Sequence, residues 1–184
     1  MRYRFAFIIL ASLASCSLAV DEERSHFRVD TMLWSDTTRT DDDGSARTKR
    51  KVGHDSIGIG YGGGYFDTID RKLVGWEMTV GSEQLGQLDG WSLRASLRWY
   101  WPISDALRPY LTLGAGGLYL EDLEAAQGEL HIGLGAELPI DEGWFADLQL
   151  DYLYPGEPAL DELTETIETE FEGWSLRLGL GWEF

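Results

Sequence analysis

Charged side chains and histidine recur in this sequence at alternate positions of stretches whose other positions are apolar. In the stretch 144–154, Asp147 and Asp151 alternate with alanine, leucine and tyrosine. Basic and acidic side chains on one shared face can form ion pairs, and a row of such pairs either gates an ion path or fills it. We expect one interior face to carry Arg28, Asp30, Glu77, Arg94, Arg98, Glu129, His131, Glu137, Asp147, Asp151, Arg177 and Glu183.

Buried charges of this kind need partners, because an isolated buried charge costs several kcal/mol. The order of the stretches predicts three sets of pairs: Glu77 with Arg94 or Arg98, Asp147 or Asp151 with Arg177, and Arg28 with Glu183. Exchange of these partners would open an ion path, whereas fixed pairs would plug it. We favour the plug, because a small barrel has an interior just wide enough for its side chains.

The three histidines do not indicate catalysis. His131 is expected on the interior face, and the position two residues later is Gly133, which offers no nucleophile. His26 and His54 lie near the starts of apolar stretches without a Ser-His-Asp arrangement, and the three also lack metal-ligand spacing. We therefore expect neither an enzyme, nor a resident metal, nor a cofactor.

An acidic segment near the C-terminus is the other candidate site. It contains no Lys or Arg, and its carboxylates are Glu157, Asp161, Glu162, Glu165, Glu168, Glu170 and Glu172. Carboxylates can bind Ca²⁺ or Mg²⁺, which could bridge to lipid phosphates. The framework of a calcium loop is missing here, and Asp41 to Gly44 lacks EF-hand spacing. A solvated surface loop is the simpler interpretation.

The elements that position these side chains are strands. From Trp174 to Phe184 every even position is large and apolar and every odd one is Ser, Arg, Gly or Glu, which is the period of a strand. Eleven such residues, at about 3.3 Å each and tilted, cross an apolar layer about 25 Å thick. Similar alternation occurs in stretches 27–34, 56–65, 74–81, 91–101, 109–120, 129–138 and 144–154.

The eight stretches are joined by connections that alternate between long and short. This rhythm predicts an all-β fold: an eight-stranded antiparallel up-and-down transmembrane β-barrel with tight inner turns and longer outer loops. The expected long connections include 35–51, 82–89 and 155–173, and 67–70 is a short one.

Aromatic residues decide which face meets lipid. They cluster at the ends of the stretches on the apolar face, which is typical of aromatic girdles at the two membrane interfaces. The expected girdle residues are Trp91, Trp99, Trp101, Trp144, Tyr152, Tyr154, Trp174, Trp182 and Phe184. The opposite face mixes charges with glycine, as in Gly58, Gly60, Gly62 and Gly64, which suits a narrow interior. A soluble lipocalin-like barrel, with its apolar face inward, is the alternative.

The N-terminus reads as a secretory leader in residues 1–19. Basic residues are followed by an apolar run from Phe5 to Leu13, too short to span a membrane as a helix. Cleavage after Ala19 competes with a bacterial lipobox, Leu13 to Cys16, in which Cys16 would be lipidated. A short spacer, 20–25, then precedes the barrel, 26–184. Cys16 is the one cysteine of the sequence, which excludes an intrachain disulfide.

Together these patterns resemble the small eight-stranded outer-membrane barrels of Gram-negative bacteria, of the OmpA and OmpX type. The terminal alternation that closes on Phe184 is similar to the signal by which the barrel-assembly machinery recognises such chains. The resemblance implies an outer-membrane location with both termini in the periplasm. Lipids, lipopolysaccharide and possible bridging divalent cations are then the expected partners. A net charge of −17 disfavours nucleic acid.

We expect a structural or surface-interaction protein that displays acidic extracellular loops around a charge-plugged lumen. A narrow passive pore for small ions is the alternative. Some barrels of this type modify lipid A, and such an enzyme and a soluble carrier are the remaining hypotheses.

Overall fold

The computed structural model describes residues 22–42, 46–66, 71–101, 106–123, 125–158 and 168–184. Nearly all of them lie in strands. The elements are β1 (Glu22–Asp42), β2 (Arg47–Val52), β3 (His54–Phe66), β4 (Lys72–Leu85), β5 (Leu88–Tyr100), β6 (Arg108–Leu120), the 3-10 turn η1 (Glu121–Leu123), β7 (Ala125–Asp141), β8 (Trp144–Pro158) and β9 (Glu168–Glu183).

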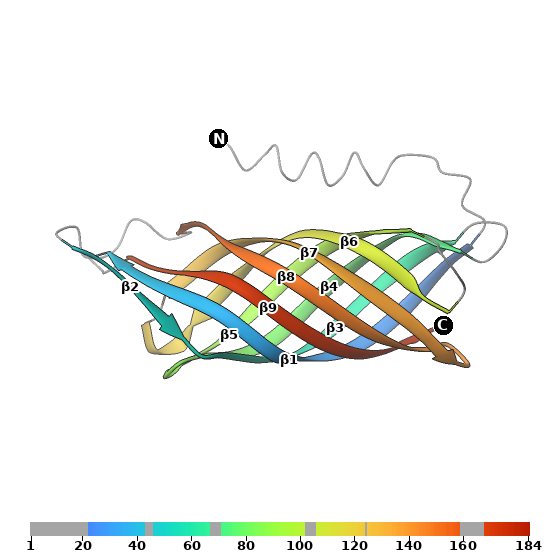
Figure 1. Ribbon diagram of the computed structural model, residues 1–184, viewed down its shortest axis with the longest axis horizontal. Coiled ribbons are helices and arrows are strands. Elements are labelled where there is room, and N and C mark those ends of the chain that lie inside the picture. The colour runs from blue at the N-terminus through green and yellow to red at the C-terminus, as the bar shows by residue number, and fades with distance from the viewer. Residues whose placement is uncertain (1–21, 43–45, 67–70, 102–105, 124, 159–167) are drawn as a thin grey trace.

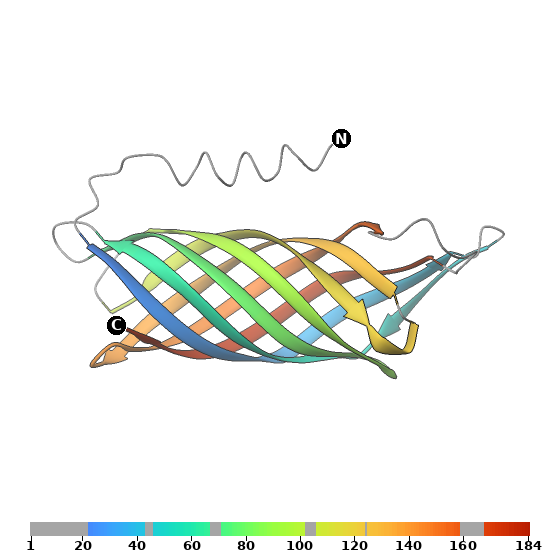
Figure 2. The same ribbon diagram turned by 180° about the vertical axis from the view of Figure 1, so that it is seen from behind.

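The strands form a closed antiparallel barrel. Each strand from β3 to β8 pairs with the strand that follows it, and β1 pairs with both β3 and β9, which closes the ring. The barrel is elongated, with strongly tilted strands (Figures 1 and 2). Eight strands, β1 and β3 to β9, make the wall, so the predicted eight-stranded up-and-down barrel is confirmed. β2 is an additional strand that pairs with the C-terminal part of β1, from Thr37 to Asp42.

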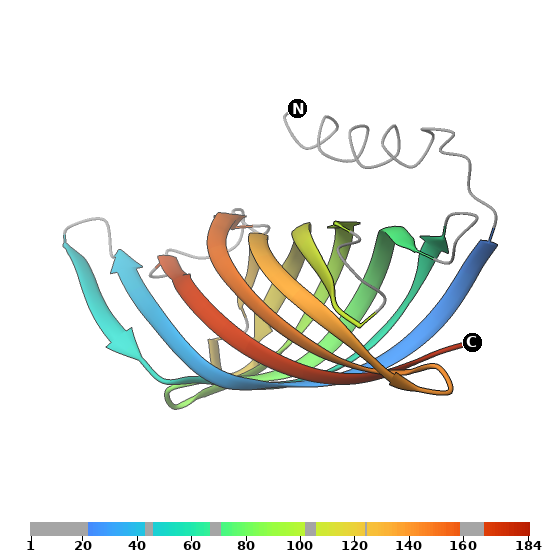
Figure 3. The same ribbon diagram turned by 45° about the vertical axis from the view of Figure 1, so that its right-hand side comes forward.

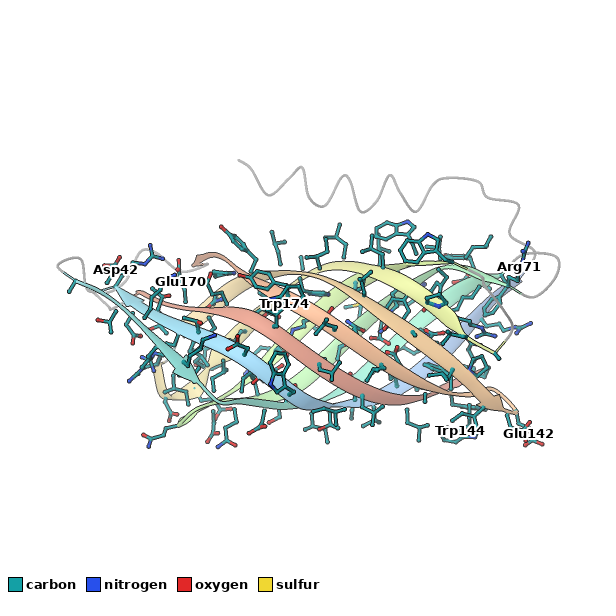
Figure 4. The ribbon with its side chains drawn as sticks, viewed as in Figure 1. Asp42, Arg71, Glu142, Trp144, Glu170 and Trp174 are labelled. Atoms are coloured by element: carbon teal, nitrogen blue, oxygen red, sulfur yellow. The ribbon has the colours of Figure 1, made fainter. Side chains whose placement is uncertain are left out.

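The barrel has two distinct ends. β1 begins and β9 finishes at one of them, called here the terminal end, where Arg71 and Glu142 also lie. Asp42 and Glu170 mark the opposite, distal end (Figure 4). Beyond the barrel wall the distal part of β1 pairs with β2 on one side and with the distal part of β9 on the other. These three strands are called here the distal sheet.

The apolar side chains face outward. Ile59, Val80 and Leu134 are 63%, 57% and 57% exposed, and comparable exposure recurs on every strand of the barrel wall. A water-soluble protein rarely exposes an apolar surface that surrounds the whole molecule. The opposite positions are buried and carry glycine or polar groups. The outer face is therefore the lipid-facing one, and the lipocalin-like alternative is wrong.

Aromatic residues lie on this outer face near both ends of the barrel. Trp144 and Trp182 pair across β8 and β9 at the terminal end, whereas Tyr152 and Trp174 pair on the same two strands toward the distal end. Of the nine aromatic residues expected in girdles, seven are exposed and two are half-buried between neighbours. The exposed ones are Trp91, Trp101, Trp144, Tyr154, Trp174, Trp182 and Phe184; the half-buried ones are Trp99 and Tyr152.

Two expected connections are wrong, because strands continue into them. The polar stretch 35–51 is mostly a β-hairpin, in which β1 runs on to Asp42 and β2 returns. β4 and β5 likewise extend into the expected loop 82–89 and meet at a two-residue turn, where Gly86 takes a positive φ of 69°. In the β4 extension the outward residues Ser82 and Gln84 are polar and exposed, whereas the inward residues Glu83 and Leu85 are buried.

Two further differences concern β1. It begins at Glu22, so residues 22–25 belong to the barrel instead of to the expected spacer. The alternation also predicts Trp34 on the interior face, yet Leu33 and Trp34 are both exposed, at 54% and 52%. A β-bulge between Met32 and Trp34 causes this change, since one extra residue moves all later side chains to the other face.

The expected leader, including Cys16 and its two processing sites, lies outside the described residues. So does the short connection 67–70. Among the residues that the structure describes, no helix is long and apolar enough to cross a membrane.

Candidate functional site

The barrel interior is the candidate site. All twelve residues expected on the interior face lie there, and their side chains are buried or nearly so. Glycine on the neighbouring strands makes room for them. A Cβ added to Gly60, for example, would lie 2.8 Å from Cδ of Glu77. The long charged side chains therefore occupy space that glycine leaves free on the strands beside them.

A central cluster joins Arg28, Arg98, Glu77, Asp147 and Asp30. Arg28 donates to Glu77 at 2.6 Å and to Asp147, and it lies 3.3 Å from Asp30. Arg98 lies 3.1 Å from the same Glu77 oxygen and 3.6 Å from Asp147. Each arginine thus touches at least two carboxylates, and each of Glu77 and Asp147 touches both arginines. Sharing of this kind holds all four side chains in one arrangement.

A second cluster, the terminal-end plug, fills the barrel where the chain ends. Lys72 is fully buried, with its ammonium 3.2 Å from Glu137 and 2.8 Å from Glu183. The same ammonium lies 5.0 Å from the ring centre of Tyr100 and 5.5 Å from that of Phe145, within cation–π range. Charge and aromatic bulk together close this end.

A third cluster lies on the distal side of the centre. Arg94 donates to Glu129 and lies 2.8 Å from Glu83. Glu83 also accepts a hydrogen bond from Ser92 at 2.5 Å and lies 2.8 Å from Nε2 of His54. Five groups from four strands, β3, β4, β5 and β7, therefore meet in this cluster and link these strands in that part of the wall.

Beyond this cluster an apolar cap closes the distal end. Leu85, Leu118, Leu120 and Phe171 are at most 2% exposed and pack together, with Val52 and Leu88 against them. The side chain of Gln127 is hydrogen-bonded to both the backbone N–H and the carbonyl of Phe171, at 3.1 and 3.3 Å. The cap is an inward-facing apolar core, which an open water-filled channel would not contain.

A cavity of about 30 Å³ lies between the central and distal clusters. Polar atoms of its lining lack a hydrogen-bond partner: Nε of Arg28, Oδ2 of Asp30, Oδ1 of Asp151 and Nδ1 of His131. Donors and acceptors are mixed, which matches water better than a single ion. The volume suffices for about two water molecules.

The observed ion pairs differ in part from the predicted ones. Glu77 pairs with Arg98, as one of the two predicted options states. Arg177 lies 3.1 Å from Asp30 on β1, whereas the prediction paired it with Asp147 or Asp151. The predicted pair of Arg28 and Glu183 is wrong. Arg28 contacts the central carboxylates, and Glu183 binds Lys72 and Arg108. Arg177 and Asp30 lie on the adjacent strands β9 and β1, whereas Arg28 reaches across the interior to β4 and β8.

Several interior residues were not predicted. Lys72 and Glu83 fall just outside the expected limits of their stretch, although continued alternation from Glu77 and Thr79 would have found Glu83. His26 and His54 contact Glu77 and Glu83 inside the barrel. Lys72 has no such signal, since a bulge opposite Tyr65 and Phe66 sets its direction.

The acidic segment is described only in part. Asp161, Glu162 and Glu165 lie outside the described residues. Glu170 and Glu172 lie on β9 in the distal sheet, where they pair with Arg47 and Lys49 at 3.1 Å each. Among the described residues no cluster of three or more His, Cys, Asp or Glu side chains could hold a metal ion.

The other face of the distal sheet carries a smaller network around Asp41. This carboxylate accepts hydrogen bonds from Arg39 at 2.6 Å and from Thr169 at 2.9 Å, and Arg50 lies 3.7 Å away. Burial raises the pKa of Asp41, but the hydrogen bonds and the nearby positive charges outweigh it and hold the pKa below the usual range. Asp41 therefore stays ionised on a sheet that faces water.

A closed eight-stranded barrel with an apolar outer face, aromatic girdles and a filled polar interior defines the class: this chain has the fold of the small outer-membrane β-barrels. No family model matches the sequence, and no curated protein sequence matches it.

Solved structures show the likeness in fold. Neisserial surface protein A is 14% identical and matches over 89% of this chain and 100% of its own, with a TM-score of 0.54. The outer membrane enzyme PagL is 12% identical and matches over 82% of this chain and 97% of its own, with a TM-score of 0.50.

Proposed function

We propose that this protein is a structural and surface-interaction protein of the outer membrane. Its barrel is closed to solutes, its termini lie in the periplasm, and its distal sheet stands outside the cell. One observation carries the proposal: the interior is filled from the terminal-end plug through the central and distal clusters to the apolar cap. A channel needs a continuous wet path, and these layers interrupt it.

Planar-bilayer recording tests this function. The wild-type barrel is expected to give no discrete conductance steps. Arg98→Ala removes a side chain that touches three carboxylates of the interior, so this variant should conduct small ions if its side chain helps to fill the lumen. Arg94→Ala is a second variant of the same kind. Steady conductance by the wild-type protein would replace this proposal with the passive pore.

The passive pore remains the second candidate because of the cavity beside Arg28 and Asp151. Its unpartnered polar atoms show where a wet path would begin if the shared ion pairs exchanged partners.

We also propose that the barrel has no lipid-modifying activity. All three histidines of the sequence are buried inside the barrel, so none reaches a lipid acyl chain from the outer face. Purified barrel incubated with lipid A should leave its mass spectrum unchanged. Loss or gain of an acyl chain would show an enzyme.

The proposed partners are membrane lipids, lipopolysaccharide and the barrel-assembly machinery. Phe184 lies on the outer face, stacked on Phe27 with ring centres 5.7 Å apart. Phe184→Ala should therefore lower the amount of folded barrel in the membrane more than it lowers the stability of barrel refolded in detergent. Calorimetric titration with Ca²⁺ tests the acidic segment: heat at millimolar metal would support bridging to lipopolysaccharide.

A further inference from the structure

β2 is a strand with one open edge. Within the ranges that the structure describes, it pairs with β1 alone. β3 continues the line of β2 and is flanked by β4, but β4 ends at Leu85, opposite His54, and so does not extend alongside β2. In Figure 3 β2 stands at the outer limit of the sheet, next to β1. The backbone N–H and C=O groups along its free side are therefore open to another strand.

β2 also carries four basic residues among its six. Arg47, Lys49, Arg50 and Lys51 are each more than half exposed, with side chains between 55% and 65% accessible. The arginines and lysine inside the barrel are buried. Each of these cations already has one carboxylate of the distal sheet as a partner: Glu170, Glu172, Asp41 and Asp36 in turn. Exposed pairs of this kind are weak, and an arginine or lysine has donors for a second carboxylate, so the row still favours an acidic partner.

The distal sheet itself shows which acidic pattern fits. Glu170 and Glu172 lie two positions apart on β9 and reach across β1 to Arg47 and Lys49, at 3.1 Å each. Thr40 of β1 is buried beneath these two pairs, only 2% exposed. An extended strand with a carboxylate at every second position therefore matches the basic row of β2. β9 presents this acidic pattern from the far side of β1, and the free edge of β2 is the one that faces away from β1.

We infer that the free edge of β2 binds an acidic, extended peptide segment of a partner protein by strand addition. The peptide backbone pairs with the open N–H and C=O groups. Glutamate or aspartate at alternate positions then opposes Arg47, Lys49 and Lys51 on one face of the sheet, and a further carboxylate opposes Arg50 on the other face. The inference rests on the proposed function in one respect: the partner meets β2 outside the cell.

Other occupants fit less well. Two copies of β2 side by side would place like charges opposite each other, which is destabilising. Lipid phosphates would use the side chains but leave the backbone edge open. Basic residues on an edge strand also prevent aggregation without any ligand, and the experiment below separates that role from binding.

The experiment uses the full-length barrel in nanodiscs of uncharged lipid and a fluorescent peptide containing Glu-Thr-Glu-Phe-Glu, the pattern of residues 168–172. Fluorescence anisotropy at low salt should show saturable binding. Two peptide controls separate the contributions: one has glutamine for each glutamate, and one keeps every glutamate but has N-methyl groups at alternate backbone nitrogens. Both should bind at least about tenfold more weakly, because each loses one of the two kinds of contact.

Two variants of the barrel locate the site. Arg47→Gln combined with Lys49→Gln and Lys51→Gln should weaken binding at least about tenfold. Arg71→Gln, an exposed cation at the opposite end (Figure 4), should leave binding unchanged. Heat-modifiable migration on a gel shows that both variants are folded. Amide hydrogen exchange should slow on β2 when the glutamate peptide is bound.

Three results would overturn the inference: no binding of the glutamate peptide, equal binding of the N-methylated peptide, or equal binding by the triple variant. Equal binding of the N-methylated peptide would point to recognition of charge alone, as for lipid phosphates. These outcomes are independent of conductance, so a conducting barrel would overturn the proposed function and leave this inference standing.

Discussion

The barrel interior and the distal sheet both contain ion pairs between basic and acidic side chains, but the interior pairs are buried and the distal ones are exposed to water. Inside, Arg98 and Glu77 are each 1% exposed and share further partners. On the distal sheet, Lys49 and Glu172 have side chains that are 55% and 30% exposed. A buried charge that loses its partner has no water to replace it, whereas an exposed one is solvated at once. The interior pairs therefore depend on one another for their stability, whereas the exposed pairs can exchange a partner for water or for another charged group.

The largest expected effect is that of Glu77→Leu. This change removes a carboxylate that Arg28, Arg98 and His26 all contact, and it leaves two buried guanidinium groups short of negative charge. The free energy of unfolding should fall by about 3–5 kcal/mol. Urea unfolding in lipid vesicles, followed by tryptophan fluorescence, measures it. A loss below about 1 kcal/mol would mean that water reaches these groups and that the interior resembles the surface.

A smaller effect is expected from Gly181→Ala, which tests whether the interior is filled as well as charged. An added Cβ would lie between 2.2 and 2.8 Å from three atoms of the Phe145 ring, which is itself 1% exposed in the terminal-end plug. We expect a loss of about 1–3 kcal/mol in unfolding free energy. Gly117→Ala is the matched control, because its nearest neighbour would be 3.7 Å away. Equal stability of the two variants would argue for an empty lumen.

The smallest effect is expected from Glu172→Gln on the distal sheet. It breaks the exposed pair with Lys49, and the unfolding free energy should change by less than about 1 kcal/mol. High salt should abolish even this difference, since it screens exposed charges, but should leave the effect of Glu77→Leu nearly intact. A change as large as that of Glu77→Leu would erase the distinction between the two regions.

Alternation in the sequence was enough to find the barrel and its two faces. From Trp174 to Phe184 the period of two is strict, and the structure follows it residue by residue. The reason is physical: the lipid and the narrow interior impose opposite demands on alternate positions, and these demands hold across the whole membrane. The inward placement of Arg94, Arg98 and Glu129 followed from the same rule.

Positions where the membrane no longer imposes this pattern were predicted less well. Thr37 to Asp42 and all of β2 are strands with polar residues on both faces, and their sequence resembles a loop. The bulge at Leu33 and the direction of Lys72 depend on pairing with distant strands. The partners of Arg28 lie across the interior on β4 and β8, and the partner of Arg177 lies across the junction of β9 with β1. Local sequence contains none of this information.

The pairing of β1 with β9 has a consequence for how the protein is made. These strands share the longest run of paired residues in the sheet, from His26 opposite Glu183 to Asp42 opposite Glu168. They are the first and last strands that the structure describes, so their pairing closes the longest loop of the sheet and has the largest loop-closure cost. Until β9 has been synthesised, β1 and β8 each have an edge whose backbone N–H and C=O groups lack a partner strand and can pair with other chains. Biogenesis must therefore keep the nascent chain apart from its neighbours and join the seam last.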